Sequence, residues 1–194
     1  MDELFKNNTY RILELFIEFP TKDFSVRGLA RELKLSHATI LNYINDLQKL
    51  SLIKKKDATL YPTYFANTES QTYKLYNRNW IIFKIIKSGL IDHMQQESLP
   101  SSIILFGSGA KATFTEKNDI DIFIEANKTK LDLTKYEKKL NHKINLLFKQ
   151  NINNLSKELR NNIINGIVLY GFIKITGWQK RLSWTQRIRI QKHH

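Results

Sequence analysis

The sequence predicts an α+β protein with an N-terminal module of three helices and a β-hairpin, followed by a small mixed sheet with flanking helices. Two observations support this class. The first 67 residues alternate between helical and extended apolar patterns, and residues 102–125 contain two short apolar strands separated by a Gly-Ser turn and a polar loop. With 194 residues and 42% hydrophobic side chains, the chain can bury two small cores. We expect an N-terminal module over 1–67, a connecting helix and linker over 68–99, and a second module over 100–194.

The N-terminal module begins with a helical spacing of apolar residues over 10–19, which stops before Pro20. Ser25 and Ser36 each precede a further helical pattern, so we expect them to be N-caps. An extended hairpin is expected next, over 53–65. The predicted order is therefore helix, short strand, helix, turn, helix and hairpin.

This order, with the stretch LARELKLSHATILNYINDLQKLSLIKK, resembles the winged helix-turn-helix family. The resemblance implies that the third helix enters the major groove of double-stranded DNA, while the hairpin lies beside the phosphates. The residues that would contact DNA are His37, Thr39, Asn42 and Tyr43 on the helix, and Lys54, Lys55 and Lys56 on the wing. A protein-interaction winged helix, with these lysines only solvated, is the alternative.

The segment between the modules is helical in pattern and carries an aromatic stripe at spacings of three and four. We expect this stripe to be a buried seam against either module or against the same helix of a second subunit, which would make a homodimer. The polar stretch 95–101 is the expected linker. The stripe consists of Tyr73, Tyr76, Trp80 and Phe83.

The richest stretch for chemistry is SIILFGSGAKATFTEKNDIDIFIE, residues 102–125. Asp119 and Asp121 lie two apart on a predicted strand, so their carboxylates project from the same face. Paired carboxylate oxygens favour a hard divalent cation such as Mg²⁺ or Mn²⁺. Gly107-Ser108, at the end of the preceding strand, offers backbone N–H groups and a hydroxyl to a phosphate.

The Gly107-Ser108 turn, the ten-residue spacer and the Asp119-Ile120-Asp121 triplet resemble the signature of the DNA polymerase β-type nucleotidyltransferases, in their minimal branch. That branch reads FGSxARG and SDIDLxV where this chain reads FGSGAKA and NDIDIFI. The resemblance implies a nucleoside triphosphate substrate, held through Mg²⁺ on Asp119 and Asp121 and through its phosphates on Gly107 and Ser108. Lys111 would assist in place of the family's usual arginine.

One position departs from the family pattern. A third carboxylate usually lies on the next strand, and the matching position here is Asn145. An amide can offer a carbonyl oxygen to a cation, but it cannot accept a proton from an attacking hydroxyl. Asn145 therefore puts catalysis in question more than binding. Asp132 and Glu125 remain alternatives as the missing carboxylate, although Glu125 lies far along the strand.

Charge is distributed unevenly along the chain. The formal net charge is +13, of which residues 1–100 contribute +3 and residues 101–194 contribute +10. A basic C-terminal region, with Tyr170, Trp178 and Trp184 available for stacking on bases, would suit a polyanionic partner, either a nucleic acid or an acidic protein. The alternative is that the tail is a strand or helix that packs on the core and leaves its basic groups exposed. The chain has no cysteine and no apolar stretch of membrane-spanning length, so we expect a cytoplasmic protein without disulfides.

Two functions from different classes follow. The first is a Mg²⁺-dependent nucleotidyltransferase that moves a nucleoside monophosphate to a hydroxyl on RNA, a protein or a small molecule, coupled to a DNA-binding module. In the family, such domains also occur in toxin–antitoxin pairs. The second is a transcription regulator whose nucleotidyltransferase-like domain binds a nucleotide or a partner without chemistry. A structural adaptor that binds neither DNA nor nucleotide ranks below both.

Overall fold

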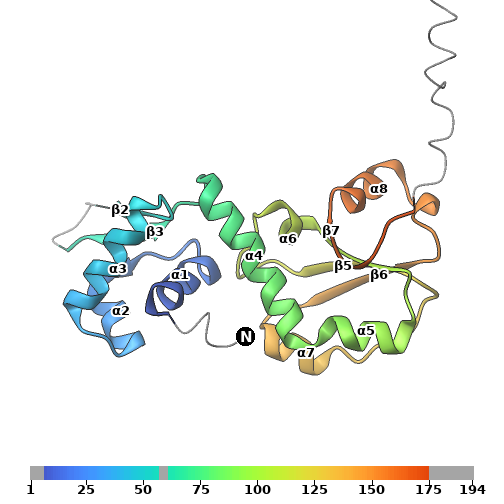
Figure 1. Cartoon of the computed structure of the whole chain (residues 1–194), viewed down its shortest axis with the longest axis horizontal. Helices are drawn as coiled ribbons and strands as arrows, with labels where there is room; N and C mark the ends of the chain where they lie inside the picture. Colours follow the sequence, from blue (N-terminus) through green and yellow to red (C-terminus); the bar gives the residue numbers. More distant parts are fainter. Residues whose placement is uncertain (1–6, 57–60, 175–194) are drawn as a thin grey trace, which may run out of the picture.

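The computed structural model describes residues 7–56 and 61–174. It contains two sheets, with strand orders β1-β3-β2 and β6-β5-β4-β7. The small sheet and the first three helices form one end of the molecule, the larger sheet forms the other, and α4 runs between them (Figure 1). The chain is thus a mixed α/β protein, as the sequence predicts.

Local capping explains the first three helices. α1 (Asn8–Glu18) ends before Pro20, and the N-cap side chain of Asn7 accepts a hydrogen bond from Thr9 N. Ser25 and Ser36 cap the helices α2 (Val26–Leu33) and α3 (His37–Lys49), which confirms both expected caps. The buried face of α3 consists of Ile40, Ile44 and Leu47, at the spacing of one helix face.

The small sheet consists of β1 (Phe24–Ser25), β2 (Ile53–Lys56) and β3 (Thr63–Ala66). The central strand β3 pairs antiparallel with both neighbours. Tyr64 and Ala66 are buried while Thr63 and Phe65 are half-buried, so one side of this strand packs on the helices.

The connecting segment forms two helices rather than one helix and a linker. α4 (Gln71–Ser88) ends at Gly89, which adopts φ +82°, and α5 (Leu90–Ser98) follows at once. Leu90, Ile91 and Met94 of α5 are buried in the core. The expected linker 95–101 is therefore partly wrong, since 95–98 are helical and only Leu99 to Ser101 connect α5 to the second sheet.

The aromatic stripe on α4 is only half buried. Tyr73 and Trp80 are each 2% exposed, whereas Tyr76 and Phe83 are 39% and 43% exposed. The reason is that the buried face of α4 is centred on Asn77 and Ile81, so the other two rings lie beyond its edge.

Tyr73 connects α4 to α1 through a hydrogen bond. Its hydroxyl donates to the Phe16 carbonyl at 3.1 Å, and the helical partner of that carbonyl would be Pro20, which has no N–H. We expect Tyr73→Phe to lower the free energy of unfolding by about 1–2 kcal/mol, because a buried acceptor is left unpaired. Urea unfolding measures this change. Tyr76→Phe, on the exposed side of the same helix, is the control, and an equal loss in both variants would contradict the prediction.

The larger sheet joins parallel and antiparallel strands. β5 and β6 are parallel and connected through α7, while β4 pairs antiparallel with β5 and β7. The helices α6 and α8 follow β4 and β6. The bounds are β4 (Ser102–Phe106), α6 (Gly107–Lys111), β5 (Ile120–Glu125), α7 (Thr134–Leu140), β6 (Ile144–Lys149), a 3-10 turn η2 (Ile152–Asn154), α8 (Lys157–Ile164) and β7 (Ile167–Gly171).

The two faces of this sheet pack on different partners. Ile120, Ile122 and Ile124 join a core that continues through α4 to the N-terminal helices. On the other face, Phe123 packs with Ile152 and Ile163 in a smaller cluster. Side chains alternate along a strand, so Asp119 and Asp121 share the face of Phe123.

Among residues 7–56 and 61–174, no helix is long and apolar enough to cross a membrane.

Candidate functional site

Three of the predicted site residues lie close together at the end of the larger sheet where β5 and β6 begin. Asp121 lies opposite Asn145 in the parallel pairing of β5 and β6. The Asn145 side-chain amide donates from Nδ2 to Asp119 Oδ2 at 3.2 Å and to Asp121 Oδ1 at 3.1 Å. The structure therefore brings together the three residues that sequence spacing places on two neighbouring strands.

This group has the oxygen donors that a hard divalent cation requires. Asp119 and Asn145 are exposed and Asp121 is half-buried, so the carboxylates are accessible from solvent. The two carboxylates supply charge and oxygen ligands, whereas Asn145 presents Nδ2 to them, and its carbonyl oxygen would become a neutral third ligand only after rotation of the amide. In the described part of the chain, no cluster of three or more Asp, Glu, His or Cys side chains could hold a metal ion. Asn145 thus occupies the place where a third carboxylate would complete such a cluster.

Gly107 brings the turn after β4 against this pair. Phe106 pairs with Asp121, and Gly107 follows with φ +67° at the start of α6. A Cβ built on Gly107 would collide with Asp121 Oδ2. Glycine is therefore needed both for the positive φ and for the close approach of the carboxylate. Ser108 is half-buried in the first turn of α6, and Lys111 is exposed at its end.

The loop between α6 and β5 contains a set of contacts that sequence reasoning missed. Asn118 Oδ1 accepts hydrogen bonds from Thr115 N at 2.8 Å and from Thr115 Oγ1 at 2.9 Å. The His142 Nδ1 lies 2.9 Å from the Asn118 carbonyl, and its ring packs on Phe114 with centroids 4.7 Å apart. In the sequence, only Asn118 in a short polar stretch indicated a turn at this place.

His142 is a structural residue rather than a solvated one, since its side chain is buried. Burial lowers its pKa below the usual 6.5, and Lys84 acts in the same direction, whereas the Asn118 carbonyl, Glu18 and Asp119 oppose the shift. The fold thus favours the neutral ring.

We expect the free energy of unfolding to fall as the pH drops below 6.5, because the unfolded chain takes up the His142 proton first. The contribution is complete above pH 6.5, and its slope is at most about 1.4 kcal/mol per pH unit. Urea unfolding at a series of pH values measures it. His142→Gln should flatten this slope, and equal slopes in wild type and His142→Gln would contradict the prediction.

The expected DNA-contacting residues of α3 differ in accessibility. His37 and Asn42 are exposed, whereas Thr39 and Tyr43 are half-buried. The Thr39 hydroxyl lies 2.7 Å from the Ser36 hydroxyl at the helix N-cap, and Tyr43 packs against the core. His37 and Asn42 are thus the most accessible of the four side chains.

Lys54, Lys55 and Lys56, which were expected to contact DNA, lie on β2 and are exposed. Lys56 Nζ is 2.7 Å from Asp23 Oδ2, and Lys54 Nζ is 3.6 Å from Glu69 Oε2. Exposed pairs of this kind are weak and are readily exchanged for another anion. The lysines therefore remain candidates for phosphate contacts.

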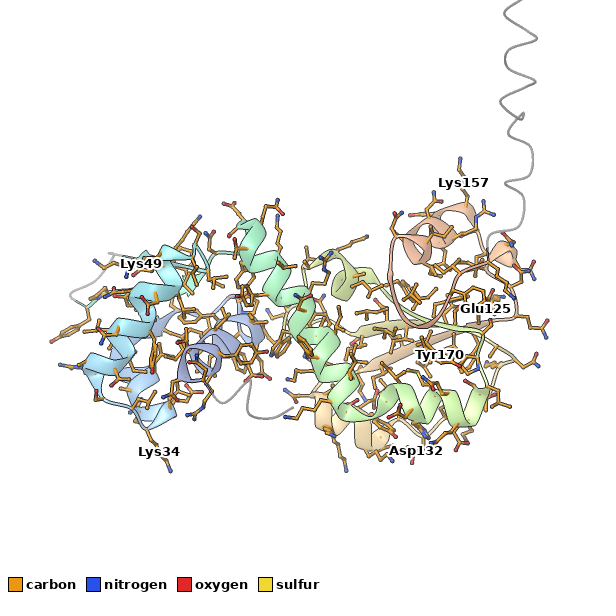
Figure 2. The ribbon with its side chains drawn as sticks, viewed as in Figure 1. Lys34, Lys49, Glu125, Asp132, Lys157 and Tyr170 are labelled. Atoms are coloured by element: carbon orange, nitrogen blue, oxygen red, sulfur yellow. The ribbon has the colours of Figure 1, made fainter. Side chains whose placement is uncertain are left out.

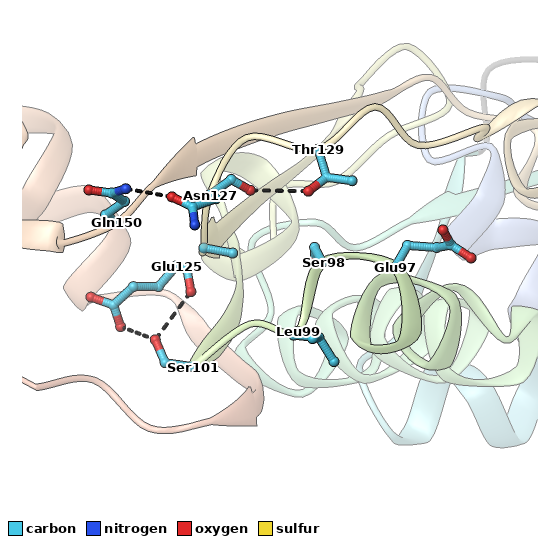
Figure 3. Close-up of a pocket in the computed structure, with 9 residues that line it drawn as sticks. Glu97, Ser98, Leu99, Ser101, Glu125, Asn127, Thr129 and Gln150 are labelled. Carbon is cyan, nitrogen blue, oxygen red and sulfur yellow. Dashed lines mark hydrogen bonds between the residues drawn. The ribbon is translucent and has the colours of Figure 1, made fainter.

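A pocket of about 560 Å³ is lined in part by Glu125 (Figure 3). Glu125 is the last residue of β5, so the pocket lies at the opposite end of this strand from the two aspartates. Glu125 Oε2 accepts hydrogen bonds from Ser101 Oγ at 2.8 Å and from Ser102 Oγ at 3.2 Å, and its Oε1 accepts one from Ile152 N. Glu125 is therefore held away from Asn145 and cannot supply the missing carboxylate. The pocket is lined by Glu97, Ser98, Leu99, Ser101, Glu125, Ala126, Asn127, Thr129 and Gln150.

Two other predicted groups lie elsewhere. Asp132 Oδ1 accepts a hydrogen bond from Thr134 N at the start of α7, and Figure 2 shows it on the outer surface of the molecule. Tyr170 is 40% exposed on β7. Trp178, Trp184 and the basic residues after Lys174 lie outside the described residues.

The comparison with known families covers this part of the chain. Residues 88–172 match the family model described as polymerase beta, nucleotidyltransferase. No curated protein matches the sequence. The matched range contains Gly107, Asp119, Asp121 and Asn145. The segment that holds these residues is therefore similar to a nucleotidyltransferase domain of the polymerase beta type.

Proposed function

We propose that this protein is a Mg²⁺-dependent nucleotidyltransferase that transfers a nucleoside monophosphate from a nucleoside triphosphate to a hydroxyl group. The observation that supports this best is the meeting of Asp119, Asp121 and Asn145 beside Gly107, within a segment similar to nucleotidyltransferase domains. The acceptor would be RNA, a protein or a small molecule.

The reaction forms a P–O bond between the acceptor hydroxyl and the α-phosphorus and breaks the bond to pyrophosphate, which leaves. A bound Mg²⁺ would neutralise charge on the phosphates. Asp119 and Asp121 would hold it, and Asn145 would offer its carbonyl oxygen once its amide had turned from the orientation in which Nδ2 donates to both aspartates. The turn at Gly107 and Ser108, with Lys111, would orient the phosphates. Asn145 cannot take the proton of the hydroxyl, so this proton would pass to solvent, to a base on the acceptor or to one of the two aspartates.

Asn145 is also the observation that favours a second candidate function. Without a third carboxylate, the domain could bind nucleotide and Mg²⁺ and use that binding to regulate the N-terminal module, with no transfer. The two functions share the site and differ only in whether a covalent product is formed.

The test is transfer of label from each of the four α-³²P nucleoside triphosphates to total RNA and to cell extract, with Mg²⁺. We expect labelled product with wild type and none with Asp119→Ala/Asp121→Ala. Asp132→Asn is the matched control, because this exposed side chain can still accept the hydrogen bond from Thr134 N. Mg²⁺-dependent nucleotide binding without product would support the regulator instead, and no binding at all would exclude both.

We also propose that the N-terminal module is a winged helix-turn-helix that binds double-stranded DNA. The order of α1, β1, α2, α3 and the β2–β3 hairpin supports this, together with the β1-β3-β2 sheet. The exposed His37 and Asn42 on α3 and the exposed lysines of β2 would face the DNA.

Fluorescence anisotropy with a labelled genomic fragment library tests the DNA-binding proposal. Replacing Lys54 and Lys56 by alanine should weaken binding to all sequences and reduce the salt dependence, since two phosphate contacts are lost. Asn42→Ala should instead reduce discrimination among sequences. Replacing Lys135 and Lys138 of α7 by alanine changes the net charge equally and is the control; equal effects of the two lysine pairs would contradict a specific DNA surface.

A further inference from the structure

We propose that Asn77 of α4 is a positioning residue for the Asp119/Asp121 pair, so that the N-terminal half of the molecule supports the metal-binding loop. This inference rests on the proposed function of that pair. Asn77 is 1% exposed, although it is polar. Its Nδ2 donates to the Phe114 carbonyl at 2.9 Å, and its Oδ1 accepts from Phe114 N at 3.3 Å. Both ends of one buried amide are thus used to hold a single residue of the loop between α6 and β5.

From Phe114, the contacts continue through His142 to the residue before Asp119. The Phe114 ring packs on His142, whose Nδ1 lies 2.9 Å from the carbonyl of Asn118. Asn118 is the residue before Asp119. On the other side of Asp119, Ile120 N donates to the Lys143 carbonyl at 2.8 Å. The backbone of Asp119 is therefore fixed on both flanks, and Phe114, which Asn77 holds, is a further fixed point of the same loop.

The same helix is bound to α1 by two hydrogen bonds. Trp80 Nε1 donates to Glu14 Oε1 at 3.0 Å, and the Tyr73 hydroxyl donates to the Phe16 carbonyl. Asn77 lies between these two residues on the buried face of α4. A direct contact, from Thr21 Oγ1 to Glu116 Oε1 at 2.9 Å, joins the turn after α1 to the same loop. α4 is therefore a shared support rather than a tether between separate modules (Figure 1).

Chemistry explains why this position requires an asparagine. The Phe114 backbone presents one donor and one acceptor, and a primary amide matches both. An aspartate would place a carboxylate oxygen against the Phe114 carbonyl and lose the donor. A leucine of similar size would leave both buried backbone groups unpaired. A serine is too short to reach both groups at once.

The experiment measures Mn²⁺ affinity by electron paramagnetic resonance in the full-length chain, with hydrogen exchange of the peptides that cover residues 112–125. We expect Asn77→Asp and Asn77→Ser to weaken Mn²⁺ binding at least tenfold. Exchange should rise around Phe114 and Asp119 but not in β7. Circular dichroism at the measurement temperature shows which of the two variants is folded. Asn77→Ser is expected to destabilise the fold less than Asn77→Asp.

Two matched variants separate positioning from general stability. Asn79→Asp adds the same charge on the exposed side of α4, and Ile152→Val removes one methylene group from the core at the other end of the sheet. Both should bind Mn²⁺ as wild type does. A folded Asn77 variant with wild-type affinity would overturn the inference while leaving the proposed function intact, whereas a wild type that binds no Mn²⁺ would overturn the proposed function as well.

Discussion

The Asn145→Asp variant is expected to be less stable than wild type without divalent cations and to recover this loss when Mg²⁺ is added. In wild type, the Asn145 amide donates to both Asp119 and Asp121. An aspartate replaces these two hydrogen bonds by repulsion among three carboxylates, so we expect a loss of about 1–3 kcal/mol in EDTA. Thermal unfolding should show a decrease of several degrees, which saturating Mg²⁺ reverses.

The same variant is expected to increase nucleotidyl transfer. A carboxylate at position 145 can accept the proton of the attacking hydroxyl, and general-base catalysis of this kind contributes roughly 10²–10⁴-fold. Label transfer measures the rate. Asn127→Asp is the control, since it adds a carboxylate at the far end of the sheet and keeps its acceptor for Gln150. A slower Asn145→Asp variant would mean that the amide itself is required, and the site would then be adapted to binding.

Gly107→Ala is expected to weaken binding of Mg²⁺ and nucleotide at least tenfold while the fold is retained. The new methyl group would meet Asp121 Oδ2, so the carboxylate must move away from Asp119 and Asn145. The positive φ of Gly107 adds about 1 kcal/mol of strain for any other residue. Mn²⁺ titration and thermal unfolding together measure the two effects.

Gly89→Ala provides the matched control for Gly107→Ala. Gly89 has φ +82°, but a Cβ there would have no atom within 4 Å. This variant should show the cost of a positive φ in its unfolding temperature and bind Mn²⁺ as wild type does. Equal Mn²⁺ affinity in both glycine variants would show that the approach of Gly107 to Asp121 does not matter for the site.

Features that depend on a few neighbouring residues were predicted well from the sequence. The caps at Ser25 and Ser36, and the helix starts that follow them, depend on a hydrogen bond between residues three apart. The common face of Asp119 and Asp121 follows from the period of a strand. The position of Asn145 followed from the resemblance to the family, in which the next strand carries a third carboxylate, and the register that pairs Asp121 with Asn145 agrees with it.

Predictions that required knowledge of packing were less successful. A stripe of aromatic residues does not show which side of α4 is buried, because Tyr76 and Phe83 are as apolar as Tyr73 and Trp80. Residues 95–98 are polar and were predicted to be a linker, but they form the last turn of α5, whose buried residues lie earlier in the helix. The link from Asn77 to Phe114 joins residues 37 apart, and no local pattern indicates it.

The sequence by itself determined the secondary structure around the site and the chemical nature of its oxygen donors, because capping, strand alternation and side-chain chemistry act over short distances. Only the tertiary structure decided how these parts act together. The pairing of β5 with β6 brings the Asn145 amide within hydrogen-bond distance of both aspartates. The packing of α4 against the loop between α6 and β5 brings Asn77 to Phe114. Such contacts arise from register and burial across the whole fold, which a linear pattern does not contain.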